Sequence, residues 1–312
     1  MDSENAGKAW MTWRGLQAED EPKLRELDRA CKQADGDEWV SNLVGDALAA
    51  IQEHVDNTFC AAGEEILLAV GWIQLLPSSE NEQQVILGGR VHPLYRRRGL
   101  GTLLLEWLEN RANLVSGYHR IRRLIIRNEA LTADAHSIYV QSGFTPIFAE
   151  NMMVCSLEHS PPADRLPETY RLVNWTAETA PLFYRAYCDA FYDRAASFDP
   201  PEKWVAEYEG DTDFLPQSSW LAISEDNRPV AFVTAGQMGK MAWISQTGVV
   251  PQLRGQGVAF GLLAHALRHF QQVGYPEVGL HVNVNNPAAI RRFYELGFRR
   301  RLTRARYEKT VL

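Results

Sequence analysis

The sequence VHPLYRRRGLG at residues 91–101 leads from an apolar segment, through a proline, into a glycine loop and then into an apolar stretch with helical spacing. A second stretch of the same kind, VVPQLRGQGVA, occupies residues 249–259. Backbone N–H groups at the N-terminus of a helix form a ready site for an anion such as phosphate. The two copies align Gly99 with Gly257. They indicate a duplicated domain with one such site in each half.

The length and composition set the first limits on the class of protein. A chain of 312 residues with 46% hydrophobic residues is long enough for two domains with packed cores. No apolar run approaches the ~18 residues that span a bilayer, so we expect no membrane partner. The formal net charge of -7 argues against a nucleic-acid partner and fits a small-molecule ligand better.

The four cysteines, Cys31, Cys60, Cys155 and Cys188, are far apart and form no C-x-x-C pair. Zinc-binding spacing and a dense disulfide framework are therefore both missing from the sequence. We expect reduced thiols in a cytoplasmic protein that needs no metal. The sequence predicts no particular oligomeric state.

The predicted elements follow the same order in both halves. In the first half we expect strands near residues 10–16, 58–62, 66–75, 84–91 and 122–127, with helices from about 20, 100–111 and 132–142, and a strand pair ending near 157. In the second half we expect strands near 170–175, 219–224, 229–235, 243–250 and 278–284, helices from about 176, 259–272 and 287–296, and a last strand. The fold class is therefore α/β, a mixed sheet covered by helices. The segment 158–165 is polar and holds two prolines, which gives domains at 1–158 and 168–312 with a linker at 159–167.

The residue types in the two loops suit a phosphate. Gly99 and Gly257 can adopt a positive φ and let a phosphate approach the backbone. Gly101 and Ala259 are small where the ligand would cross the first helical turn. Arginines in both loops would add positive charge beside a pyrophosphate.

The patterns Arg-x-x-Gly-x-Gly (residues 96–101) and Arg-x-x-Gly-x-Ala (254–259) resemble the acyl-CoA loop of the GNAT superfamily of N-acetyltransferases. The resemblance extends to the Gly-Phe pairs at 143–144 and 297–298 and to Asn286. It implies a mostly antiparallel sheet flanked by helices in each of two tandem domains, with acetyl-CoA as acyl donor. The tandem layout is also similar to that of mycothiol synthases, although the acceptor-side residues predict no particular acceptor. The residues implied to bind the donor are Val91, Arg96, Arg97, Arg98, Gly99, Leu100, Gly101, Val249, Val250, Arg254, Gly255, Gln256, Gly257, Val258, Ala259 and Asn286.

The resemblance also implies direct attack of a small-molecule amine on the thioester, with the backbone N–H near Val91 or at Val249 and Val250 polarising the carbonyl. A tyrosine hydroxyl would protonate the leaving sulfur. Tyr139 has the family spacing, four residues before its glycine. Tyr294 is only three residues before its glycine, and one residue turns a helical side chain by about 100°.

The strands before the loops carry no obvious carboxylate base. A water relay, a base from elsewhere in the chain and an amine that arrives already neutral all remain open. His281 is one candidate base, although a lone histidine on a strand is more often a structural residue. The second half also has an aromatic stretch with two aspartates at residues 183–193, which would suit a cationic amine. Together with Asn286, these features favour the second half as the catalytic one. Plain helix packing explains many of the same aromatics.

Two other functions remain open from the sequence. A protein built from two acetyltransferase-like domains could bind acyl-CoA without turnover, which the missing base and the shifted Tyr294 would fit. Alternatively, the arginines at 96–98, 122, 123 and 127 could form a nucleic-acid patch. The net charge and a loop suited to pyrophosphate argue against that patch.

Overall fold

The computed structural model describes residues 11–36, 42–79, 81–117, 121–163 and 166–312, so part of the predicted linker lies outside the described residues. It divides the chain into two compact units. The first contains the described residues up to Glu150 together with Leu302–Leu312, and the second contains Asn151–Arg301. This division differs from the predicted boundaries in two ways: the strand at Thr145–Ser156 is divided between the units, and Leu302–Leu312 pack in the first unit.

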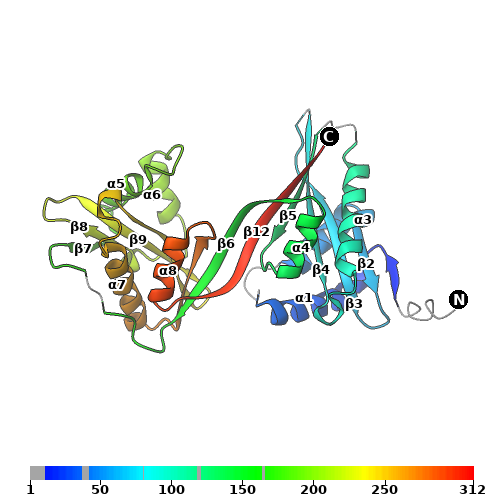
Figure 1. Cartoon of the computed structure of the whole chain (residues 1–312), viewed down its shortest axis with the longest axis horizontal. Helices are drawn as coiled ribbons and strands as arrows, with labels where there is room; N and C mark the ends of the chain where they lie inside the picture. Colours follow the sequence, from blue (N-terminus) through cyan, green and yellow to red (C-terminus); the bar gives the residue numbers. More distant parts are fainter. Residues whose placement is uncertain (1–10, 37–41, 80, 118–120, 164–165) are drawn as a thin grey trace. The chain divides into compact units, whose positions relative to one another are not determined.

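The first unit is an α/β unit whose sheet has the strand order β1-β2-β3-β4-β5-β12 (Figure 1). Its elements are β1 (Thr12–Arg14), α1 (Glu21–Asp35), α2 (Leu43–Glu53), β2 (Thr58–Ala62), β3 (Leu67–Leu75), β4 (Glu82–Val91), α3 (Leu100–Val115), β5 (Ile121–Asn128), α4 (Ala133–Gln141), the first part of β6 (Thr145–Ser156) and most of β12 (Arg299–Val311). The strands β4 and β5 pair in parallel, while β1–β2, β2–β3, β3–β4 and β5–β12 pair in antiparallel fashion.

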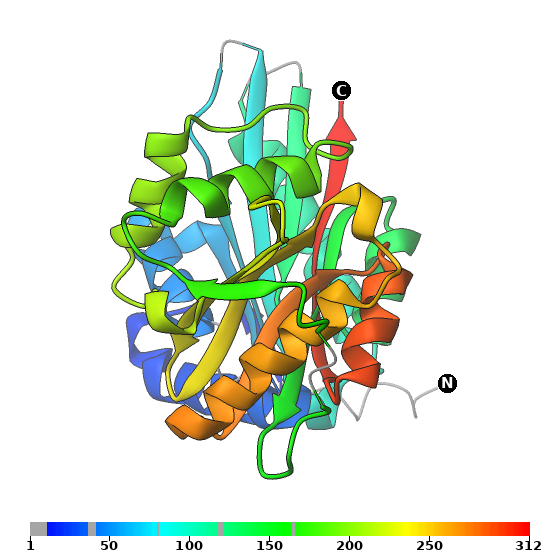
Figure 2. The ribbon, with the colours of Figure 1, turned by 90° about the vertical axis from the view of Figure 1, so that its left-hand side faces the viewer.

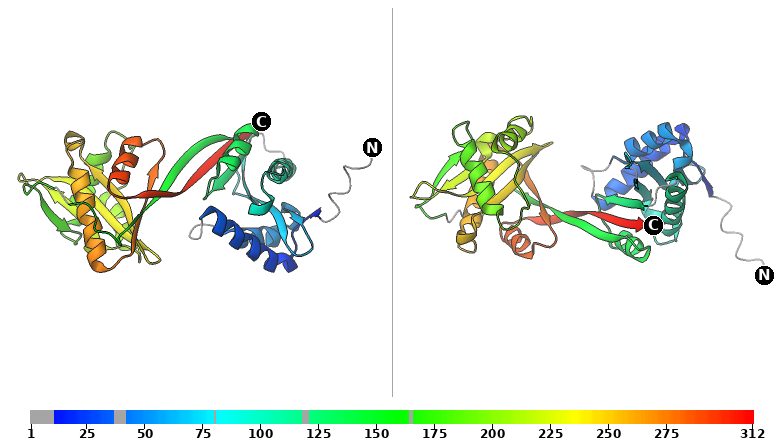
Figure 3. Two further views of the ribbon diagram at one scale, coloured as in Figure 1. Left: turned by 60° about the horizontal axis from the view of Figure 1, so that its bottom comes forward. Right: turned by 90° about the horizontal axis from the view of Figure 1, so that it is seen from above.

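Helices cover both faces of this sheet, with α1 and α3 on opposite sides (Figure 3). One core joins α3 to alternate residues of the strands, among them Val85, Leu87, Leu124 and Ile126. The other core joins α1 and α2 to the opposite face. This alternation follows from the two-residue period of a strand, which sends successive side chains to opposite faces. The helix α2 was not predicted as a separate element.

The second unit repeats the plan, with the strand order β7-β8-β9-β10-β11 and the second part of β6 beside β11. Its elements are β7 (Arg171–Asn174), α5 (Ala180–Phe191), α6 (Pro201–Glu209), β8 (Trp220–Ile223), β9 (Pro229–Met238), β10 (Met241–Val249), α7 (Val258–Val273), β11 (Glu277–Asn283) and α8 (Pro287–Glu295). The helices α5 and α6 cover one face, and α7 and α8 cover the other (Figure 2). The predicted mixed α/β sheet flanked by helices is confirmed in both units.

Candidate functional site

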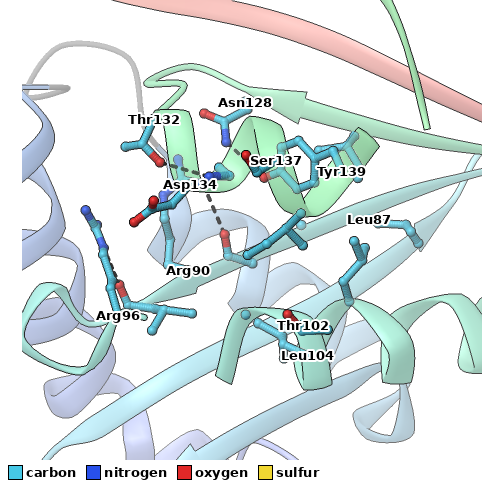
Figure 4. Close-up of a pocket in the computed structure, with 18 of the residues that line it drawn as sticks. Leu87, Arg90, Arg96, Thr102, Leu104, Asn128, Thr132, Asp134, Ser137 and Tyr139 are labelled. Atoms are coloured by element: carbon cyan, nitrogen blue, oxygen red, sulfur yellow. Dashed lines mark hydrogen bonds between the residues drawn. The ribbon is translucent and has the colours of Figure 1, made fainter. Parts of the chain in front are cut away.

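A cavity of about 400 Å³ lies in the first unit, where β4 and β5 separate (Figure 4). The two strands pair from Glu82 to Leu87 on β4, opposite Ile121 to Ile126 on β5. Beyond that point β4 and β5 no longer pair with each other, although β4 still pairs with β3 and β5 with β12, and the cavity occupies the gap between them. Its walls come from β4, the glycine loop, α3, β5 and α4. In the second unit β10 and β11 also pair in parallel, and their pairing ends at Ile244 opposite Leu280.

The two glycine loops have the same backbone conformation. The residues Arg97 and Gly99 have φ values of 61° and 81°, and Gly255 and Gly257 have values of 78° and 86°. Each loop ends in a helix N-cap glycine that provides no side-chain hydrogen bond. The first N–H groups of α3 and α7 have no acceptor within their own helices, so each loop presents N–H donors to an anion.

The other predicted loop residues lie around these donors. The first turns of the helices contain Leu100 and Gly101 in the first unit, and Val258 and Ala259 in the second. A Cβ added at Gly101 would lie 3.1 Å from the Ile138 side chain, so a small residue is needed between α3 and α4.

Arg98, Arg97 and Gln256 have contacts of their own. The guanidinium of Arg98 lies 5.1 Å from the centroid of the Tyr95 ring, and that of Arg97 lies 3.7 Å from the Asp134 carboxylate. Gln256 donates from its side chain to the Gln252 carbonyl.

The arginine that begins each motif has partners within its own unit, and its role as a phosphate ligand stays a prediction. Arg96 donates to Asp35, at the end of α1, at 2.6 and 2.7 Å, and to the Val91 carbonyl at 3.1 Å. Arg254 makes the same contacts with Asp193 at 2.6 and 3.0 Å and with the Val249 carbonyl at 3.4 Å. Bidentate pairs of this kind hold both side chains in a defined orientation. Each arginine therefore links its loop to the preceding strand and to the C-terminal end of α1 or α5.

The prediction of backbone donors before the loop is corrected for Val250. Its N–H donates to the Val230 carbonyl at 3.0 Å, as His92 donates to Leu68 at 2.8 Å. Successive residues of an antiparallel strand direct their N–H groups to opposite sides. The N–H groups of Val91 and Val249 therefore point away from the preceding strand, toward the side where the parallel pairing has ended.

Tyr139 lines the cavity from α4 (Figure 4). The side-chain amide of Asn128, at the end of β5, donates to the phenol oxygen at 2.9 Å. The Asn128 carbonyl oxygen accepts from the Ala130 N–H, which fixes the orientation of the amide. Burial raises the pKa of the Tyr139 phenol, so the group is protonated at neutral pH. The phenol O–H therefore remains available as a donor. Sequence reasoning missed Asn128, although it lies at the end of a predicted strand.

Tyr294 lies elsewhere on its helix. Its side chain is exposed, at 43%, and the Arg299 guanidinium lies 5.9 Å from its ring. The position that corresponds to Tyr139 holds Phe293, which is 6% exposed and packs against Phe298. The shift of one residue thus replaces a phenol with a hydrocarbon ring in the second unit.

Asn286 is the N-cap of α8, where its side-chain oxygen accepts from the Ala289 N–H at 3.2 Å. In the first unit Thr132 accepts from the Ala135 N–H at the same distance and caps α4. The two residues therefore have equivalent capping roles. Sequence reasoning missed Thr132. A threonine matches an asparagine here only because both cap a helix, and the sequence comparison did not consider the capping role.

His281 lies on β11 just beyond Leu280, the last residue that pairs with β10. Its ring packs edge-on against Trp243, with the ring centroids 4.8 Å apart.

The residues of the predicted acceptor stretch at 183–193 have two different roles. Phe183 is buried in the core under α5, and Asp193 is bound to Arg254. The Arg254 hydrogen bonds hold the pKa of Asp193 at about 2.

Two observations concern metals and membranes. Among the described ranges, no group of three or more His, Cys, Asp or Glu side chains could hold a metal ion. No helix in the described part of the chain is long and apolar enough to cross a membrane.

Comparison with known families gives a match in each half. The profile of the "Acetyltransferase (GNAT) family" matches residues 171–298, and the profile of the "Acetyltransferase (GNAT) domain" matches residues 56–146. Each match contains the glycine loop of its unit.

Curated relatives match over most of the chain. A mycothiol acetyltransferase from Parafrankia sp. is 26% identical over 96% of this chain and 98% of its own length. A mycothiol acetyltransferase from Saccharomonospora viridis is 28% identical over 67% of this chain and 69% of its own length.

Solved structures show the same fold. A GCN5-related N-acetyltransferase from Sphaerobacter thermophilus has a TM-score of 0.64 at 23% identity, covering 97% of this chain and 96% of that one. A tandem GNAT protein from the clavulanic acid biosynthesis pathway has a TM-score of 0.52 at 17% identity, covering 96% and 98%. With a GNAT profile and a glycine loop in each half, the chain is an acyltransferase that belongs to the GNAT acetyltransferase family and carries two of its domains in tandem.

Proposed function

We propose that the chain transfers the acetyl group of acetyl-CoA directly to a primary amine of a small molecule, and that the first unit carries out the transfer. The similarity to mycothiol acetyltransferases supports a small-molecule acceptor. We choose the first unit because the Tyr139 phenol lies in its cavity, where the phenol oxygen accepts a hydrogen bond from Asn128. The sequence alone favoured the second half, but Tyr294 is exposed there and Asp193 is bound to Arg254.

The residues around the cavity fit the donor. Acetyl-CoA supplies an acetyl group activated as a thioester. The N–H groups of the loop and of the first turn of α3 would hold its pyrophosphate. Gly99 permits the loop conformation, and the lack of a side-chain cap leaves the helix donors available. The cavity between β4 and β5 would take the pantetheine arm.

Two groups of the chain would act on the reacting atoms. The Val91 N–H points toward the gap between the strands and would donate to the carbonyl oxygen as negative charge grows there. The Tyr139 O–H would give its proton to the leaving sulfur. Because burial raises the pKa of this phenol, the donor stays protonated across the neutral range.

The second unit supports the alternative function, binding of acyl-CoA without transfer. Its loop has the same positive φ values and an uncapped helix start. Its α8 carries Phe293 where a proton donor would be needed. We therefore propose that the second unit binds acyl-CoA without turnover.

The four free cysteines support a reducing compartment such as the cytoplasm.

The decisive experiment measures CoA release from acetyl-CoA with a thiol dye across a panel of small amines. We expect Tyr139→Phe to lower kcat by about 100-fold, because the leaving sulfur loses its proton donor. Tyr294→Phe is the matched control, since the same atom is removed from an exposed ring, and it should leave kcat within about twofold. Equal activity of Tyr139→Phe and wild type would refute the role of the phenol. No CoA release by wild type with any amine would refute transfer and leave the binding function.

A further inference from the structure

The last strand of the chain completes the sheet of the first unit (Figure 1). Residues of β12 pair with β5 in an antiparallel register that sets Ala305 opposite Asn128. The Leu131 N–H donates to the Thr303 carbonyl at 2.7 Å, just before α4 begins. At the other end of α4, the Lys309 ammonium donates to the Ser142 carbonyl at 2.8 Å. The C-terminal strand therefore holds β5 and both ends of α4.

Tyr307 lies at the centre of these contacts. Its side chain is only 1% exposed, and its ring centroid lies 5.0 Å from that of Tyr139. Its hydroxyl is 2.6 Å from Nδ1 of His136. His136 and Tyr139 are three residues apart on α4 and share a face of the helix. Tyr307 thus contacts two side chains on one face, which fixes the rotation of α4 about its axis.

We infer that Tyr307 is a positioning residue for the Tyr139 phenol, so that the C-terminal strand supplies part of the transfer site in the first unit. This inference rests on the proposed function of Tyr139. The rotation of the helix matters because a turn by one residue, about 100°, moves a side chain out of the site. Phe293 and Tyr294 show the outcome of such a shift in the second unit.

The test uses the full-length chain with two substitutions of Tyr307. We expect Tyr307→Leu to lower kcat about tenfold, with the acetyl-CoA affinity measured by calorimetry changed less than twofold, because the loop is untouched. Tyr307→Phe keeps the ring and should retain kcat within about threefold. Ile73→Ala is the control for general loss of stability, since Ile73 is fully buried in the same core and does not line the cavity. It should lower the unfolding temperature and leave kcat within about twofold.

A second measurement does not depend on turnover. Titration of ring-labelled tyrosine by NMR should give a raised pKa for Tyr139 in the wild type, because the phenol is buried. In Tyr307→Leu the phenol should lose a ring neighbour and become more hydrated, and its pKa should fall toward the ordinary value of about 10. An unchanged pKa would overturn the inference, as would unchanged kcat in Tyr307→Leu or an equal loss of kcat in Ile73→Ala. If wild type acetylates no amine, the proposed function fails and the titration alone decides the position of the phenol.

Discussion

The two units have the same loop but different side chains behind it. Both loops have two residues with positive φ and an uncapped helix start. The helix that follows the next strand carries Tyr139 in one unit and Phe293 at the corresponding place in the other. Donor binding depends on backbone conformation, which survives much sequence change. Proton transfer depends on one side chain in one register, so it is lost more easily.

Among the effects on donor binding and stability, the largest one we expect separates the two loops. Gly99→Val should weaken acetyl-CoA binding to the first unit by about 30-fold or more, because a β-branched residue is strained at positive φ and the loop donors would be redirected. Gly257→Val should do the same to the second unit. Calorimetry should give two equivalents for wild type and one tight equivalent for each variant. Gly274→Val is the matched control, since its φ is +99° at the end of α7 and no atom lies within 4 Å of the added Cβ. Full loss of both equivalents in either single variant would contradict independent sites.

A smaller effect distinguishes the two arginine–aspartate pairs. The Asp35 side chain is 9% exposed, and that of Asp193 is 45% exposed. Asp35→Asn should lower the stability of the first unit by about 2 kcal/mol, because Arg96 would lose a charged partner in a mostly buried setting. That loss corresponds to a fall of roughly 4–8 °C in its unfolding temperature. Asp193→Asn should have a clearly smaller effect, since water screens the exposed pair. Calorimetric melting of both variants checks this order, and a larger shift in Asp193→Asn would reverse it.

The smallest expected effect is a pH dependence in the second unit. The Arg254 hydrogen bonds lower the pKa of Asp193 to about 2, below the ordinary value of about 3.9. A lowered carboxyl pKa stabilises the folded state above pH ~4, and that stabilisation disappears as the pH falls from ~4 toward ~2. The difference in unfolding temperature between wild type and Asp193→Asn should therefore shrink across this range. A constant difference from pH 6 to pH 2 would show that the pair does not titrate as described.

The sequence predicts those parts of the site that depend on local chemistry. Glycine suits positions 99 and 257, where φ is positive, and the spacing of Tyr139 from its glycine goes with a side chain that lines the cavity. The alternation of apolar residues predicts the strands on either side of each loop. Tyr294 departs from this spacing, and its side chain is exposed.

Long-range contacts could not be predicted in the same way. Arg96 is bound to Asp35 and Arg254 to Asp193, and both pairs are 61 residues apart in the chain. The repeated spacing of 61 residues could have indicated the two pairs. An arginine beside a glycine loop is more simply interpreted as a phosphate ligand, so the spacing was not used. The place of Tyr307 depends on which strand pairs with β5, and strand pairing over such distances leaves no local pattern.

The C-terminal strand also sets the time at which the first unit can be completed during synthesis. Lys309 bonds with Glu109, which is 200 residues earlier in the chain. While the ribosome makes the second unit, β5 remains an edge with unpaired backbone groups, a type of edge that is prone to wrong pairing. A chain released before β12 would leave that edge open and Tyr139 without its neighbour Tyr307. Translation must therefore reach β12 before the sheet of the first unit can be completed.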